Sequence, residues 1–111
     1  MAELQQIIAQ QGPLPIKATA TIETDVPVTL MLAGSVWTPT AEQMIGIGLL
    51  IDGEGAAEAQ IFSNGSNEHR AVVPVTFAYT FTIGDHTFQL GPLTGATTSD
   101  ANDFFSLTAL Y

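Results

Sequence analysis

Two groups of polar side chains in this sequence could bind a small ligand, and the first surrounds the only arginine. His69 and Arg70 follow a polar loop that contains Asn64 and Asn67. A planar guanidinium beside an imidazole and two amides offers paired donors for a carboxylate or for the hydroxyls of a sugar. The competing interpretation is that Arg70 forms an ion pair with one of the eleven acidic residues, for example across a subunit interface.

The second group consists of Asp100, Asn102 and Asp103, whose side-chain oxygens could bind calcium. The stretch lacks the glycine and the terminal glutamate of an EF-hand loop. Aspartate and asparagine at such spacing more commonly cap backbone amides in turns. We therefore expect no metal and no cofactor, and these three residues are the only candidate ligands if a metal binds.

The remaining titratable residues do not indicate an enzyme. His86 shares its parity with Phe88, which predicts a buried, hydrogen-bonded histidine rather than a catalytic base. The two histidines lie far apart and have no acidic partner three or four residues away, so they make no zinc pattern. Asp52 and Glu54 flank a glycine in a tight turn, where the paired carboxylates of a glycosidase would lack a cleft. No nucleophile elbow, phosphate loop or dinucleotide fingerprint occurs.

The elements that must position these groups are β-strands, because apolar residues alternate with polar ones along several short segments. Residues 16–22, 28–36 and 73–81 show this pattern. Residues 44–52 and 104–111 are apolar on both faces, which is typical of strands covered on both sides. Turn residues separate the segments, so the fold class predicted is all-β, an antiparallel two-sheet sandwich.

The connections between these strands also carry signals. Asp52-Gly53 predicts a hairpin after residues 44–52. Residues 69–90 read as one long β-hairpin that turns at Gly84. The segment 104–111 should lie centrally in its sheet rather than at an edge.

The N-terminal segment, residues 1–13, has a different composition. Leu4, Ile7 and Ile8 have helical spacing, and Gly12-Pro13 would end a helix. We expect a short helical or disordered segment here, either a flexible tail or the end of a stalk. Residues 14–111 form the single β-sandwich domain.

The charge content of the chain limits the kinds of molecule that it can bind. The formal net charge is −9, which repels phosphate backbones and anionic lipid, so we expect neither nucleic-acid binding nor membrane insertion. Only 12% of the residues are charged, too few to cover a monomer of this size, which favours an oligomer. No cleavable signal peptide is evident in this chain, and the compartment stays open, with the extracellular space or a particle surface as candidates.

The order of the strands and turns resembles the bacterial and phage relatives of the tumour-necrosis-factor and complement-globular-head jelly-roll family. The likeness covers about residues 14–111. It depends on the two-sided strand 44–52 with its DG hairpin, the return Gly84-x-His86-x-x-x-Leu90 and the terminal stretch Asp103-x-Phe105-Ser106-Leu107-x-x-x-Tyr111. It implies a TNF-like jelly roll that forms a homotrimer, with the terminal strand near the threefold axis and aromatic residues packed between subunits. The residues expected at that interface are Gly46, Gly48, Tyr79, Phe104 and Tyr111.

Two hypotheses follow for function. The first is a non-enzymatic, trimeric, lectin-like binding module that recognises a carbohydrate at its rim or between subunits. The alternative is a structural head or trimerisation domain of a phage fibre, a spore-surface filament or a secreted filament. A ligand-free trimer would favour the alternative, whereas glycan binding would favour the first.

Overall fold

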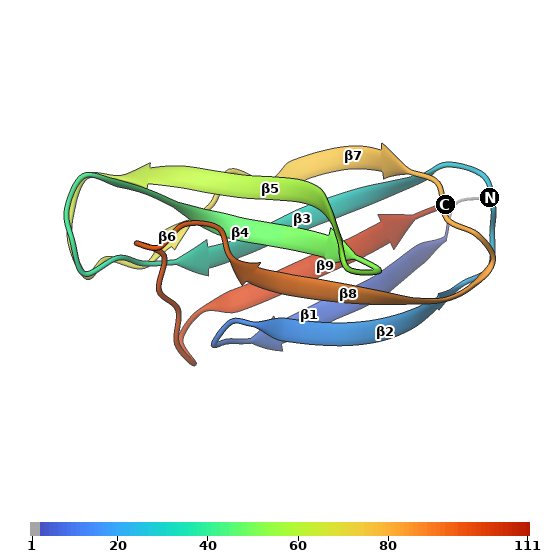
Figure 1. Ribbon diagram of the computed structural model, residues 1–111, viewed down its shortest axis with the longest axis horizontal. Coiled ribbons are helices and arrows are strands. Elements are labelled where there is room, and N and C mark those ends of the chain that lie inside the picture. Colours follow the sequence, from blue (N-terminus) through green and yellow to red (C-terminus); the bar gives the residue numbers. More distant parts are fainter. Residues whose placement is uncertain (1–2) are drawn as a thin grey trace.

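The alternating segments form nine strands in two antiparallel sheets that pack face to face (Figure 1). The computed structural model describes residues 3–111, and this part of the chain contains no helix. The first sheet contains, in spatial order, β1 (Leu4–Gln11), β9 (Phe104–Leu110) and β3 (Val28–Val36). Two shorter strands, β6 (Arg70–Ala71) and β7 (Val75–Tyr79), both pair with the outer edge of β3. The second sheet contains β2 (Ile16–Ile22), β8 (Gly84–Pro92), β4 (Gln43–Ile51) and β5 (Glu54–Ser63).

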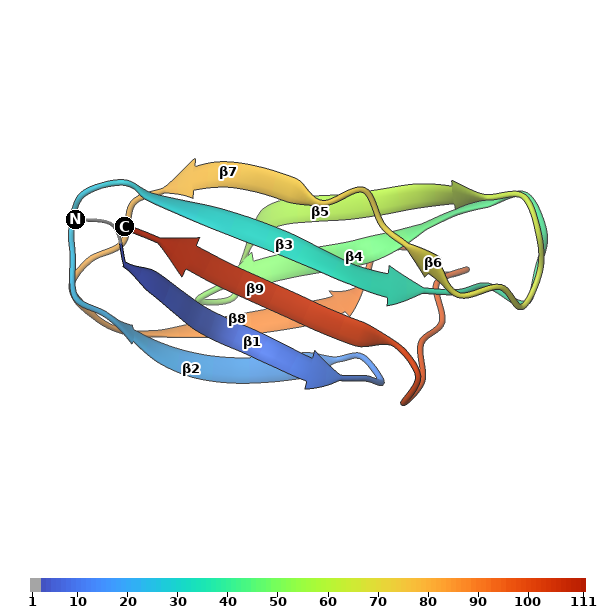
Figure 2. The same ribbon diagram turned by 180° about the vertical axis from the view of Figure 1, so that it is seen from behind.

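The topology is that of a jelly roll, because most connections cross between the sheets and only β4–β5 and β6–β7 stay within one sheet. Strands β1, β3 and β9 belong to the first sheet, whereas β2, β4 and β8 belong to the second. The predicted fold class, an antiparallel two-sheet jelly-roll sandwich, is confirmed. Figure 2 shows the first sheet from its outer side, with β9 between β1 and β3, so the predicted central position of the terminal strand is also confirmed.

The core lies between the sheets and is filled by alternate residues of both. Leu32, Ile47, Phe88 and Phe105 are fully buried there. Each such side chain contributes about 1.5–3 kcal/mol to the stability of the fold. At Gly34 a Cβ atom would lie 2.7 Å from Phe105 Cδ1 and 2.8 Å from Ile47 Cδ1, so this glycine lets the two sheets approach closely.

The prediction of a helix at the N-terminus is wrong for the described residues, because residues 4–11 form β1 and pair with β9. Residues 1–2 of the predicted segment lie outside the described part of the chain. A bulge between Gln6 and Ile8 interrupts the alternation. It places the consecutive residues Ile7 and Ile8 against the core, which imitates the spacing of a helical face. Strand β1 is therefore part of the sandwich.

The prediction of a hairpin over residues 69–90 is also wrong, because its two strands lie in different sheets. Strand β7 pairs with β3, whereas β8 pairs with β2 and β4. The residues before Gly84 cross from one sheet to the other, and Phe81 is buried at this crossing, only 3% exposed. By contrast, the predicted Asp52-Gly53 hairpin is confirmed. Both residues have positive φ angles, 53° and 85°, as a two-residue type I′ turn requires.

The sandwich is elongated, about 43 × 22 × 20 Å, and its two ends differ. At one end the backbone N–H of Tyr111 donates to the carbonyl of Glu3, 2.9 Å away. The opposite end, here called the distal end, carries β6 and the connection that leads into β9 (Figure 1). Within residues 3–111, no helix is long and apolar enough to cross a bilayer.

Candidate functional site

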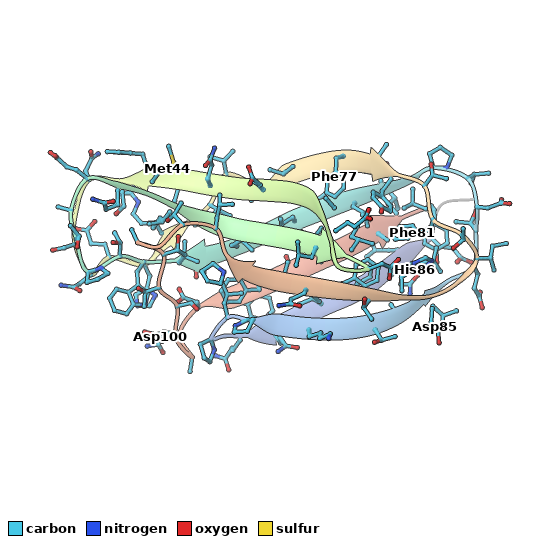
Figure 3. The ribbon with its side chains drawn as sticks, viewed as in Figure 1. Met44, Phe77, Phe81, Asp85, His86 and Asp100 are labelled. Carbon is cyan, nitrogen blue, oxygen red and sulfur yellow. The ribbon has the colours of Figure 1, made fainter. Side chains whose placement is uncertain are left out.

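Strand β3 explains why polar residues from three parts of the chain meet at the distal end. Both β6 and β9 are antiparallel to β3, so the residues that precede each of them lie beside the end of β3. These are His69 before β6 and Asp103 before β9, and Trp37 follows β3 directly. Figure 3 shows Asp100 at this end of the sandwich. The distal site is defined as Trp37, His69, Asp100 and Asp103.

The carboxylate of Asp103 is the fixed point of the distal site. It is fully buried, and an ion in that position is costly unless donors surround it. Its Oδ1 accepts hydrogen bonds from Ser35 Oγ and His69 Nδ1, each 2.7 Å away. Its Oδ2 accepts the backbone N–H of Asp100 at 2.9 Å. These three contacts fix the position of the carboxylate, and its hydrogen bond with Nδ1 holds the imidazole ring of His69 in one orientation.

His69 is therefore aimed by a buried carboxylate while its outer edge remains open. Its Nε2 lies 3.6 Å from Asp100 Oδ2, and the side chains of His69 and Asp100 are 38% and 42% exposed. The hydrogen bond to Asp103 raises the pKa of His69 above 6.5, and the negative charges of Asp103 and Asp100 act in the same direction, against burial. The indole ring of Trp37 lies beside the imidazole, with ring centroids 5.8 Å apart.

The structure brings together only some of the residues predicted to bind ligand. His69 joins Asp100 and Asp103, although the sequence places these aspartates in a separate polar group. Arg70 Nη1 lies 3.9 Å from Glu68 Oε2, a loose and exposed ion pair. Asn67 lies near the distal site, since its backbone N–H donates to the carbonyl of Thr38 at 2.7 Å. The other two predicted residues have exposed positions: Asn64 in the loop after β5 and Asn102 in the turn before β9, where Asp100 Oδ1 accepts its backbone N–H.

The distal site also contains residues that sequence reasoning missed. Ser35 and Trp37 were not candidates, although both belong to the segment that the site is built on. No local spacing links them to His69 or Asp103, because the contact depends on the pairing of β3 with β6 and β9. The sole tryptophan at a strand end was the one available signal.

The second histidine lies at the other end of the sandwich (Figure 3). His86 is 8% exposed and hydrogen-bonded, as predicted. Its Nδ1 lies 2.6 Å from Asp52 Oδ2, and its Nε2 lies 2.7 Å from the carbonyl of Thr82. Both partners only accept, so the ring donates from both nitrogens and is an imidazolium ion. Hydrogen bonding to Asp52, then to Thr82, raises the pKa of His86 above 6.5.

An open groove of about 700 Å³ lies on the outer face of the second sheet. Gly48 of β4 and Gly91 of β8 are register partners, and because neither has a side chain, the backbone itself lines the groove there. Leu93 and Glu58 contribute to its walls. Gly46 differs from Gly48, because a Cβ atom there would lie 2.5 Å from the carbonyl oxygen of Ala59 in β5. The backbone that comes close to Gly46 is therefore that of β5 in the same chain.

The three aromatic residues expected at a subunit interface occupy different environments. Phe104 points outward from β9 and is 51% exposed. Tyr79 is half-buried and packs against Phe81, with ring centroids 4.6 Å apart. Tyr111 is half-buried and its hydroxyl donates to Gln5.

Comparisons with known proteins add evidence on the fold. No protein-family model matches the sequence, and no curated protein matches it. The chain is similar in structure to part of dimeric latent PorU from Porphyromonas gingivalis, with a TM-score of 0.58 over 98% of this chain and 5% identity. It spans 12% of that PorU chain. It is also similar to the C-terminal domain of EclA, a sugar-binding protein, with a TM-score of 0.50 and 16% identity over 98% of this chain and 76% of that domain's chain. At these identities the similarity shows the β-sandwich fold alone.

Proposed function

We propose that this chain is a non-enzymatic carbohydrate-binding module whose ligand binds at the distal site. The observation that carries the proposal is the arrangement of His69 and Asp100 beside Trp37 at the open end of the sandwich. A carboxylate oxygen accepts sugar hydroxyls through short, charge-assisted hydrogen bonds, and an aromatic side chain offers an apolar surface next to them. Such a mixture of a few fixed polar groups and an aromatic side chain is typical of small-molecule sites.

The similarity to the EclA domain supports the same function by analogy of fold. That domain is a sugar-binding protein, and it shares the β-sandwich over nearly the whole of this chain. A shared fold does not determine function, so the proposal depends on the residues of the distal site.

The proposal includes self-association, as a homotrimer of the kind that the TNF-like resemblance implies. Strands β1, β3, β7 and β9 of the first sheet contain no charged residue, although the chain carries eleven acidic ones. Copies of a chain with net charge −9 repel one another, and contact through this sheet brings the fewest like charges together. Four large apolar side chains of these strands are exposed: Leu4, Met31, Phe104 and Leu110.

The test of carbohydrate binding is a glycan array probed with labelled protein. We expect binding to a restricted set of glycans, and we expect Asp100→Asn and His69→Gln to abolish it. Glu58→Gln is the matched control, since it removes an exposed carboxylate from β5 in the other sheet. Equal binding by Asp100→Asn and the unchanged protein would contradict the distal site as the place of recognition.

The uncharged face of the first sheet also favours a second candidate, a structural trimerisation domain. This candidate predicts a stable oligomer that binds no glycan on the array. Light scattering measures the mass of the particle, and the array decides between the two candidates.

A further inference from the structure

The facing atoms of His69 and Asp100 have the spacing of two ligands on one metal ion. His69 Nε2 and Asp100 Oδ2 are 3.6 Å apart, which is longer than a hydrogen bond. Bonds of about 2.0–2.1 Å to a tetrahedral zinc ion place two ligand atoms about 3.3–3.4 Å apart. A shift of a few tenths of an ångström in either exposed side chain would bring both atoms onto one ion.

The imidazole is also oriented as a metal ligand should be. Histidines that bind metals commonly donate their other ring N–H to a carboxylate, which fixes the tautomer and the direction of the ring. Asp103 has this role, because it accepts from Nδ1 and is held by Ser35 Oγ and the Asp100 backbone. Nε2 is thereby left as the nitrogen that faces Asp100.

The charge balance of the distal site favours a cation. Two carboxylates, Asp100 and Asp103, lie in one turn, with only the imidazole of His69 beside them. The permanent cations of the chain are Lys17, on β2, and Arg70, whose ion pair is with Glu68. Neither is paired with Asp100.

We propose that His69 Nε2 and Asp100 Oδ2 bind a divalent transition-metal ion of the zinc type. Asp103 orients the imidazole, and water fills the remaining coordination positions. The mixed nitrogen and oxygen donors suit zinc, cobalt or nickel, whereas calcium prefers a shell of oxygen atoms. This inference goes beyond the carbohydrate proposal and does not need it, because the metal alone is the probe.

The single tryptophan provides the test. Trp37 is the only tryptophan, and its ring centroid is 5.8 Å from that of His69, so cobalt bound there should quench its fluorescence. We expect Co²⁺ to cause saturable quenching at one equivalent, which EDTA reverses and Zn²⁺ competes away. Asp100→Asn and His69→Gln should each weaken the apparent affinity at least about 10-fold, whereas Glu58→Gln should leave it unchanged.

Calorimetry with Zn²⁺ alone supplies the second measurement, on variants that circular dichroism shows to be folded. The proposal is overturned if the unchanged protein gives neither saturable quenching nor binding heat. It is equally overturned if both variants bind as tightly as the unchanged protein, because the ion would then occupy another acidic surface.

Discussion

Replacing Asp52 by asparagine tests whether His86 is an imidazolium ion in the folded protein. The two acceptors of the His86 ring are Asp52 Oδ2, 2.6 Å away, and the carbonyl of Thr82, 2.7 Å away. Asparagine keeps the size of the side chain and tolerates the φ of 53° at this position. The substitution Asp52→Asn therefore removes the negative charge while preserving the turn and an acceptor oxygen.

The expected loss of stability follows from the strength of this contact. A hydrogen bond to a charged group contributes about 1.5–3 kcal/mol, whereas a neutral one contributes about 0.5–1.5 kcal/mol. The side chain of Asp52 is 50% exposed, so solvent screening reduces the difference to the lower part of that range. We expect Asp52→Asn to lower the free energy of unfolding by about 1 kcal/mol at pH 6, which corresponds to about 4 °C in Tm.

The effect should depend on pH in a definite direction. Hydrogen bonding between the two groups raises the pKa of His86 above 6.5 and lowers the pKa of Asp52 below 3.8. A raised histidine pKa stabilises the fold below pH 6.5, and this stabilisation is lost as the pH rises through the raised value. A lowered aspartate pKa stabilises the fold above pH 3.8, and this is lost as the pH falls through the lowered value. The difference between the two proteins is therefore largest between about pH 4 and 6.5.

The assay is urea denaturation of both proteins from pH 4 to pH 9. Glu54→Gln is the control, because it removes an exposed carboxylate from the same turn. The reasoning would be refuted if Asp52→Asn lost the same free energy at pH 6 and pH 9. A loss no larger than that of Glu54→Gln would refute it as well.

Two further predictions concern the core and the uncharged sheet. Gly34→Ala should cost about 1–3 kcal/mol in urea denaturation, because its Cβ would lie 2.7 Å from Phe105 Cδ1. Gly91→Ala, whose Cβ meets nothing within 4 Å, should cost less than about 0.5 kcal/mol, and equal losses would contradict this packing. The double variant Met31→Glu with Phe104→Glu should reduce the mass measured by light scattering to that of one chain. An unchanged mass would exclude the outer face of the first sheet as the contact.

Much of the fold could be predicted because strand patterns are local. The two-sided stretch 104–111 indicated a central strand, and Asp52-Gly53 indicated the hairpin turn between β4 and β5, since both signals depend on neighbouring residues. The pairing of residues 69–90 could not be predicted in this way. Alternation shows which face of a strand is apolar, but it does not say which sheet the strand joins.

The N-terminal error and the distal site have related causes. The bulge in β1 puts Ile7 and Ile8 on the core side, and no residue in the sequence marks a bulge there. The distal site joins His69 to Asp103, 34 residues away, through strands that both pair with β3. The residue types were visible in the sequence, whereas their meeting depends on a topology that the sequence did not specify.

The most direct test of carbohydrate recognition is to map the binding surface by NMR, titrating the protein with the glycan that binds best on the array. The account predicts that the largest shifts occur at the indole N–H of Trp37 and at the amides of His69 and of residues 100–103. Shifts confined to the groove around Gly48 and Gly91, or no glycan that binds at all, would contradict it.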